Sequence, residues 1–180
     1  MYYFITQDLN DHSFVSLLGH TDESGKHLWV SGTPLTEPYL NDVFLVESSM
    51  ETDIRMPDFF DTVAPLMSKR LLDAIVSLGV DNLETYPVTI KNKITEQVFD
   101  NYLAVNIIGS MDVVDYEKSI RKGRYRFKSI VLDETKTMGM LCFRLHKGPA
   151  ELVVHESVAK PLMNMDLNGI KIISIEEFSQ

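Results

Sequence analysis

The sequence is poor in the residues on which redox, thiolate-metal and membrane-spanning functions depend. Cys142 is the only cysteine in 180 residues, so neither an intramolecular disulfide nor a cysteine metal cluster can form. No apolar run approaches the roughly 20 residues that span a bilayer, and the N-terminal stretch lacks the features of a signal peptide. We therefore expect a cytoplasmic protein that does not insert into a membrane.

Short catalytic and metal-binding motifs are absent as well. The chain has no glycine-rich phosphate loop, no Gly-x-Ser-x-Gly elbow and no His-Glu-x-x-His sequence. His12, His20 and His27 are seven or eight residues apart in turn-rich sequence, unlike the ligands of a compact zinc site. We expect no metal, no cofactor and no enzymatic activity. Because many enzymes carry no short motif, an enzyme stays open as an alternative.

Positive charge is scarce in the first third of the chain. Residues 1–64 contain eleven Asp or Glu but only Lys26 and Arg55, whereas residues 65–180 contain fifteen residues of each sign. The whole net charge of -9 therefore originates in the N-terminal third. Such a surface either serves solubility alone or attracts a basic partner, and it disfavours general affinity for nucleic acid.

Turn residues separate short apolar runs in this acidic third. The runs YYFIT, SFVSLL, HLWVS and VFLVE predict strands, and together they favour a small antiparallel sheet. Farther along, LETYPVTI, YLAVNII, YRFKSIVL, MGMLCFRL, ELVV and IKIIS also predict strands. Pro87 places the first of these at an edge or bulge, because proline cannot donate to a ladder.

Two short amphipathic helices are expected between these strands. The first follows Ser68 as its N-cap and ends before Gly79 as its C′ residue, with apolar residues at helical spacing from Leu71 to Leu78. The second covers about residues 157–165, and Pro161 is expected near its first turn, where a missing donor costs least.

The two predicted helices lie in segments that resemble each other in pattern. Residues 66–86 align with 153–173 without a gap, and ten aligned positions are apolar in both copies although none is identical. The alignment predicts a repeated strand-helix-strand shape. The alternative is that any two amphipathic helices of this length show such a similarity. The predicted fold class is α+β, mostly antiparallel, with two or three short helices. We expect an acidic β-rich lobe at 1–57 and an α+β region at 58–180, as two lobes or as one domain.

Asp112 and Asp115 are candidates for a carboxylate pair. On a helical turn their Cβ atoms would lie about 5 to 6 Å apart, close enough to perturb one pKa or to hold a cation. A small hydrolase or transferase using Asp112, Asp115 and Arg144 is therefore one alternative. The simpler interpretation is structural, because both carboxylates can accept from unpaired backbone donors after Gly109.

Two residues inside predicted strands also have a structural and a functional interpretation. Asn106 interrupts an apolar strand, and its buried amide must find a partner, for which a neighbouring loop is favoured over a ligand. Cys142 and His146 would be about 13 Å apart on one strand face, too far for a thiolate and its base. Cys142 is therefore expected to be a small buried hydrophobic residue.

The stretch KSIRKGRYRFK, residues 118–128, holds six Lys or Arg with two aromatic residues interleaved. Such a pattern can bind phosphates and stack bases, so a nucleic-acid binder is a further alternative. In a strand, Arg124, Arg126 and Lys128 would share one face and Tyr125 and Phe127 the other. A half-buried strand explains the same alternation, and its basic face could complement the acidic third.

In this order, YLAVNIIGSMDVVDYEKS, SIVLD, CFRL, ELVVHESV and NGIKII resemble a bacterial family of immunity proteins in polymorphic toxin systems. This family was first catalogued as a domain of unknown function. The resemblance covers about residues 58–178, and the first 57 residues do not share it. The residues that carry the pattern, which we expect to be structural, are Asn106, Asp112, Asp115, Ser119, Asp133, Phe143, Arg144 and Gly169.

The resemblance implies a non-enzymatic, cytoplasmic protein that binds a cognate toxin and blocks it. It does not imply which toxin activity is blocked. An acidic inhibitor of a basic toxin gains association rate from electrostatic steering. We therefore expect a basic protein toxin as the partner, and neither nucleic acid nor a membrane. The expected binding face consists of Asp22, Glu23, Glu37, Asp42, Glu47, Glu51 and Asp53.

Overall fold

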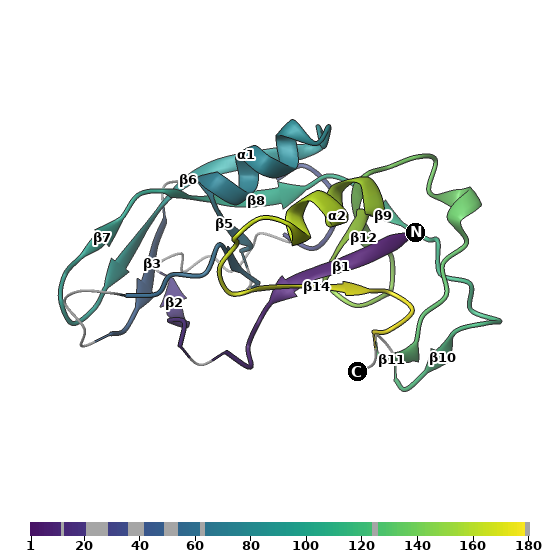
Figure 1. Cartoon of the computed structure of the whole chain (residues 1–180), viewed down its shortest axis with the longest axis horizontal. Helices are drawn as coiled ribbons and strands as arrows, with labels where there is room; N and C mark the ends of the chain where they lie inside the picture. The colour runs from purple at the N-terminus through teal and green to yellow at the C-terminus, as the bar shows by residue number, and fades with distance from the viewer. Residues whose placement is uncertain are drawn as a thin grey trace.

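The computed structural model describes residues 1–11, 13–20, 29–35, 42–48, 54–61, 64–123 and 126–178. Within these residues the fold is α+β, with two α-helices and mostly antiparallel sheets, which confirms the predicted class at this level. The helices α1 (Lys69–Ser77) and α2 (Glu156–Met163) contact each other and cover the same side of the strands (Figure 1).

One sheet joins strands from the two ends of the sequence. Its order is β14-β1-β13-β12-β9, and every pairing is antiparallel except the parallel pairing of β12 with β9. The N-terminal strand therefore lies between two strands from the last thirty residues. The bounds are β1 (Tyr2–Gln7), β9 (Ser110–Met111), β12 (Cys142–Leu145), β13 (Leu152–His155) and β14 (Ile170–Ser174).

The second sheet has the order β2-β3-β6-β8-β5-β4, with β7 paired to β6. Its pairings are antiparallel except for β3 with β6. The sheets form a nearly closed, barrel-like arrangement, and β8 leads almost directly into β9 of the first sheet. The bounds are β2 (Leu17–His20), β3 (Asp42–Val46), β4 (Phe59–Phe60), β5 (Leu66–Ser68), β6 (Leu83–Asn92), β7 (Val98–Phe99) and β8 (Tyr102–Ile107).

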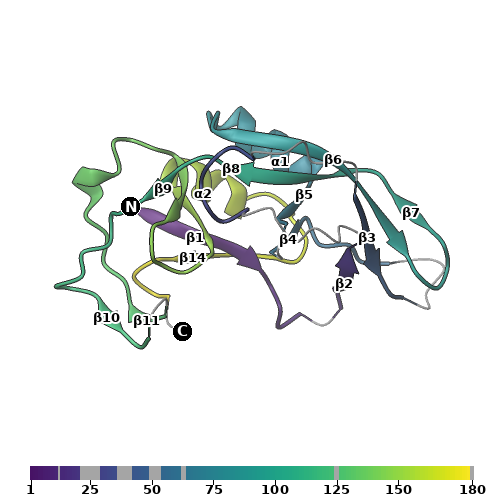
Figure 2. The same cartoon turned by 180° about the vertical axis from the view of Figure 1, so that it is seen from behind.

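A small hairpin extends from the body of the molecule. It consists of β10 (Ile120–Arg121) and β11 (Phe127–Ser129), and the 3-10 helix η1 (Glu134–Lys136) follows it. The hairpin lies at the opposite end of the molecule from β2 and β3 in both views (Figures 1 and 2).

Each helix belongs to a split β-α-β unit. In the first unit, β5 and β6 are both antiparallel to β8, which lies between them. In the second, β13 and β14 are both antiparallel to β1, which lies between them. The two strands of each unit are thus parallel to each other and are joined by a helix. The two aligned segments have the strand-helix-strand shape that their apolar pattern predicts.

The helix ends follow the predicted chemistry in α1 more closely than in α2. The Ser68 hydroxyl accepts the Leu71 N–H at 3.2 Å, and Gly79 follows the last turn with a φ of +93°, as predicted. The second helix begins at Glu156, capped by the imidazole of His155. Pro161 therefore lies in its second turn and not near its first, because the helix starts one residue earlier than predicted.

Three apolar clusters form the core. The largest lies beneath the helices and includes Leu71 and Ile75 of α1 and Leu162 of α2. A second packs on the opposite face of the first sheet around Phe4 and Phe143, and a third packs on the second sheet around Phe44 and Phe60. Alternate residues of a strand therefore enter different clusters: on β12, Cys142 belongs to the cluster beneath the helices and Phe143 to the second.

The predicted N-terminal sheet is wrong. YYFIT does form β1, but β1 pairs with β13 and β14, and β3 has a parallel partner in β6. Within HLWVS, residues 29–31 form turns and bends, because Trp29 inserts into the core and the chain reverses there. Strand β6 is not an edge strand as a whole, because it lies between β3 and β8. Pro87 itself pairs only with β8, since the pairing with β3 begins at Val88.

Among the described residues, neither α1 nor α2 has the length and apolar character required to cross a bilayer.

Candidate functional site

A buried arginine lies at the end of strand β12. The Arg144 side chain is 1% exposed, and its Nη1 donates to the carbonyl of Ala150 in the turn before β13. Neither Nε nor Nη2 has a hydrogen-bond partner among the described residues. A buried guanidinium with two unpaired donor atoms lowers the stability of the folded state, so arginine is an unusual residue at this core position.

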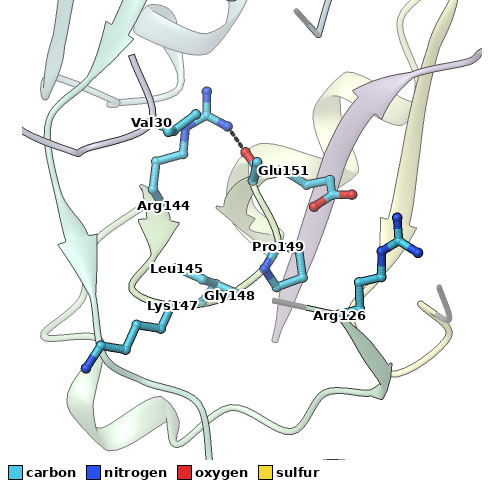
Figure 3. A pocket seen from close by; sticks show the side chains of 9 residues that line it. Val30, Arg126, Arg144, Leu145, Lys147, Gly148, Pro149 and Glu151 are labelled. Carbon is cyan, nitrogen blue, oxygen red and sulfur yellow. Dashed lines mark hydrogen bonds between the residues drawn. The ribbon is translucent and has the colours of Figure 1, made fainter. Parts of the chain in front are cut away.

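Arg144 lines a pocket of about 510 Å³. The wall of this Arg144 pocket comes from the loop that contains Val30, from the end of β12 and the following turn, and from Arg126 beside β11. Figure 3 shows Arg126 and Arg144 on opposite sides of the pocket, with Lys147 extending outward. The described residues that line it are Val30, Arg126, Arg144, Leu145, Lys147, Gly148, Pro149, Ala150 and Glu151.

Two carboxylates interact electrostatically with Arg144. Burial raises the pKa of Asp61, and the Arg144 charge and a 3.1 Å hydrogen bond from Thr6 oppose that rise. Burial lowers the pKa of Arg144, and Asp61 and Glu151 oppose that change. Among the described residues, no carboxylate forms an ion pair with the Arg144 guanidinium within 4 Å. The Arg144 charge is thus offset at longer range.

A second buried carboxylate, Asp58, is fully engaged in the fold. It accepts from the Ser68 hydroxyl at 2.5 Å and from the Asn168 N–H at 2.7 Å, and it forms an ion pair with Arg70. Its backbone exchanges hydrogen bonds with the same neighbours. This arrangement connects the start of α1 to the loop before β14, so it is structural.

The structure separates the three residues of the enzyme alternative. Asp112 is exposed and accepts from the Tyr116 hydroxyl at 3.1 Å. Asp115 accepts from the backbone N–H groups of Glu117 and Lys118, at 3.1 and 3.2 Å, in the backbone-capping role predicted for it. The Arg144 pocket is lined by neither aspartate. The capping prediction is wrong for Asp112, because its partner is a side-chain hydroxyl.

The hydrogen bonds to Lys118 and Glu117 also act on the ionisation of Asp115. The Lys118 side chain lies 2.8 Å away, and together with the backbone donors it lowers the pKa of this half-buried carboxyl. Asp115 is therefore ionised at neutral pH and is unsuited to donating a proton.

Other residues of the family-like pattern contact the fold in the same way. The Asn106 amide donates to the Thr33 carbonyl at 2.9 Å, which is the loop partner that its burial predicts. The Ser119 hydroxyl accepts from Val131 at 2.9 Å, and Asp133 caps η1. Gly169 has a φ of +61° and packs on Pro57, where a Cβ would come within 2.6 Å. Phe143 is fully buried.

The expected acidic binding face lies largely outside the described residues. Among its members, Glu47 is exposed directly after β3, and the backbone of Asp42 begins that strand. Those outside the described residues are Asp22, Glu23, Glu37, Glu51 and Asp53.

The basic stretch forms the β10–β11 hairpin. Phe127 is buried while Arg126 and Lys128 are exposed, which is the amphipathic arrangement predicted for this strand; Arg124 and Tyr125 lie outside the described residues. The Arg121 guanidinium stacks over the rings of Tyr116 and Phe127, at 4.6 and 5.5 Å from their centroids. The Arg121 cation thus interacts with aromatic rings of this region itself.

Cys142 is expected to be chemically inert in the native protein. It is fully buried beneath the helices, and burial raises the pKa of its thiol to about 12. A thiol reagent at pH 8 should label the native protein more than about 100-fold more slowly than the unfolded chain, because little thiolate forms and access is blocked. Mass spectrometry with and without denaturant measures this ratio, and rapid native labelling would contradict the packing of Cys142.

No protein-family model matches this chain. A search of curated proteins finds no match either.

Proposed function

We propose that this protein is a non-enzymatic binding protein that neutralises a cognate bacterial toxin. One observation carries the proposal: the whole net charge of -9 originates in residues 1–64, outside most of the region that resembles immunity proteins. Within that region, Asn106, Asp115 and Phe143 are engaged in hydrogen bonds or core packing. A scaffold with a separate charged surface suits a protein whose specificity depends on its partner.

The arrangement of the sheets supports a charged binding surface at one end. Strands β2 and β3 form the outer part of the second sheet, and Glu47 is exposed beside them. The basic β10–β11 hairpin lies at the opposite end (Figure 2). A basic toxin approaching the β2–β3 end would therefore meet the exposed Glu47 with little repulsion from the hairpin.

Growth rescue tests the proposal directly. The product of the gene next to this one should arrest growth when expressed alone, and co-expression of this protein should restore growth. Tagged protein from the native host should retain that same gene product at a ratio of one to one, with release at high salt. Growth arrest that co-expression does not relieve, with both proteins present and soluble, would contradict the proposal.

Charge reversal locates the binding face. Replacing Glu23, Glu37, Glu47 and Glu51 by Lys should lower the association rate with the toxin by about tenfold or more at low salt, because steering depends on these charges. Reversal of the exposed pair Glu176 and Glu177 is the matched control, and it should change the rate much less. Equal effects of the two sets would remove the acidic third as the binding face.

A further inference from the structure

The Arg144 pocket combines positive charge with an apolar wall, in a protein that is acidic as a whole. Among the described residues that line it, three are cationic, namely Arg126, Arg144 and Lys147, and one, Glu151, is a carboxylate. This balance is opposite in sign to the net charge of -9. Cations gathered around a concave surface focus the local potential and raise the local concentration of anions.

The remaining wall of the pocket suits the carbon skeleton of a ligand. Val30, Leu145 and Pro149 contribute apolar surface, and Val30 is about half exposed. A volume of about 510 Å³ exceeds what a bare inorganic ion fills and lies within the range of small-molecule sites. The pocket therefore offers both a charged part and an apolar part.

Arg144 supplies a charge that the described residues do not neutralise at close range. It donates one hydrogen bond to Ala150, and its Nε and Nη2 have no partner among the described residues. Both atoms lie beneath the surface, so they act on the pocket through their field or through an intervening water. An anion in the pocket would reduce the cost of burying this guanidinium.

We infer that the Arg144 pocket binds a small organic anion, a carboxylate or phosphate group attached to an apolar body. Arg126 contacts the anionic group, Lys147 adds positive charge at the rim, and the buried Arg144 attracts the group from beneath. The apolar body packs against Val30, Leu145 and Pro149. The inference does not rest on the proposed toxin, since it is argued only from residues of this chain.

Calorimetric titration of the full chain with four probes tests the inference. Phenyl phosphate and benzoate carry an anionic group on a ring, benzyl alcohol carries the ring without charge, and inorganic phosphate carries charge without the ring. We expect saturable binding of one or both ring anions, weaker binding of inorganic phosphate and no saturation by benzyl alcohol over the same range. Which ring anion binds more tightly identifies the anionic group.

Variants with opposite expected signs assign the binding to this pocket. Arg126→Gln and Lys147→Gln should each weaken binding by about two- to fivefold, because each removes one partly screened cation. Glu151→Gln should strengthen binding, because it removes the carboxylate of the wall. Lys171→Gln, at an exposed lysine on β14 outside the pocket, is the matched control and should leave binding unchanged.

Several results would overturn the inference. Absence of saturable binding by both ring anions would do so, as would binding that Arg126→Gln, Lys147→Gln and Lys171→Gln affect equally. Equal affinity for phenyl phosphate and inorganic phosphate would overturn the apolar part of the assignment. Because every probe is a small molecule, failure here leaves growth rescue by toxin neutralisation unaffected, and the two proposals can be told apart.

Discussion

Replacing Asp58 with alanine is expected to lower the free energy of unfolding by about 3 to 5 kcal/mol. The carboxylate is 7% exposed, and it accepts from the Ser68 hydroxyl, from the Asn168 N–H and from Arg70. Alanine would leave the buried Ser68 hydroxyl without this acceptor, and likewise the Asn168 N–H, whose hydrogen bond to Asp58 is partly buried. Urea unfolding followed by circular dichroism measures the change.

A matched variant separates the carboxylate from its ion pair. Arg70→Gln removes the cation but leaves the hydrogen bonds from Ser68 and Asn168 in place. Because the Arg70 side chain is 49% exposed, solvent screens the ion pair, and the expected loss is about 1 kcal/mol or less. Similar losses for Asp58→Ala and Arg70→Gln would mean that the ion pair dominates, contrary to the buried hydrogen-bond network.

The size of the Asp58 effect follows from what the residue connects. Ser68 and Arg70 belong to the start of α1 in the first split unit, and Asn168 precedes β14 in the second. Asp58 therefore links the two units by hydrogen bonds, in addition to the strand pairings within each unit. Loss of the Asp58 carboxylate should weaken the contact between the units. It should also weaken the N-cap of α1, since the Ser68 hydroxyl donates to Asp58 and accepts from the Leu71 N–H.

Asp58 also shows where counting charges in a sequence fails. It is one of the eleven acids of residues 1–64, which we interpreted as a solvated or partner-binding surface. Asp58 and Asp61 instead lie in partly or fully buried polar networks. A local signal was present, since both flank the aromatic pair Phe59 and Phe60 of a short core strand. A carboxylate next to such a buried strand lies close to the core, where it requires hydrogen-bond or ion-pair partners.

Local patterns predicted local structure well. The Ser68 and Gly79 signals predict the ends of α1, and short β-like runs predict β1, β8 and β14, because strand propensity and capping depend mainly on near neighbours. Which strands pair depends on contacts more than a hundred residues apart, as when β1 lies between β13 and β14. Nothing in the YYFIT run specifies those partners, so a wrong N-terminal sheet was predicted.

The candidate site was predictable only in part. Arg144 was singled out from the family-like pattern, but its burial could not be inferred, since CFRL places Cys142 and Arg144 on one strand face and Phe143 and Leu145 on the other. Both faces of β12 are covered by core, so alternation does not distinguish a buried face from an exposed one. The other charged residues of the pocket lie in two separate segments: Arg126 in the hairpin, and Lys147 and Glu151 in the turn before β13. Only the fold brings these segments together.

Replacing Gly32 with alanine is expected to lower the free energy of unfolding by about 3 to 5 kcal/mol. Gly32 has a φ of +73°, and a Cβ there would lie 2.6 Å from the Ser110 nitrogen and 2.7 Å from the Gly109 carbonyl carbon. Both are backbone atoms, so no side-chain rotation relieves the contact. The Gly32 carbonyl also accepts from the Gly109 N–H at 2.8 Å, which holds the two segments together.

Gly139→Ala is the control that isolates the backbone conformation from the clash. Gly139 has a φ of +76°, close to that of Gly32, but a Cβ there has no neighbour within 4 Å. The expected loss is about 1 to 2 kcal/mol, the cost of a left-handed conformation alone. Equal losses for the two variants in thermal and urea unfolding would show that the loop tolerates a side chain at Gly32.

The consequences of the Gly32 clash extend to both sides of its loop. Thr33 gives its carbonyl to the buried Asn106 amide, and Val30 forms part of the Arg144 pocket. A displaced loop would leave the Asn106 amide short of an acceptor and would move Val30 away from the apolar wall. Gly32→Ala should therefore weaken binding of ring anions at temperatures where the variant is still folded, whereas Gly139→Ala should not. Loss of stability with unchanged anion binding would mean that Val30 contributes nothing to the pocket.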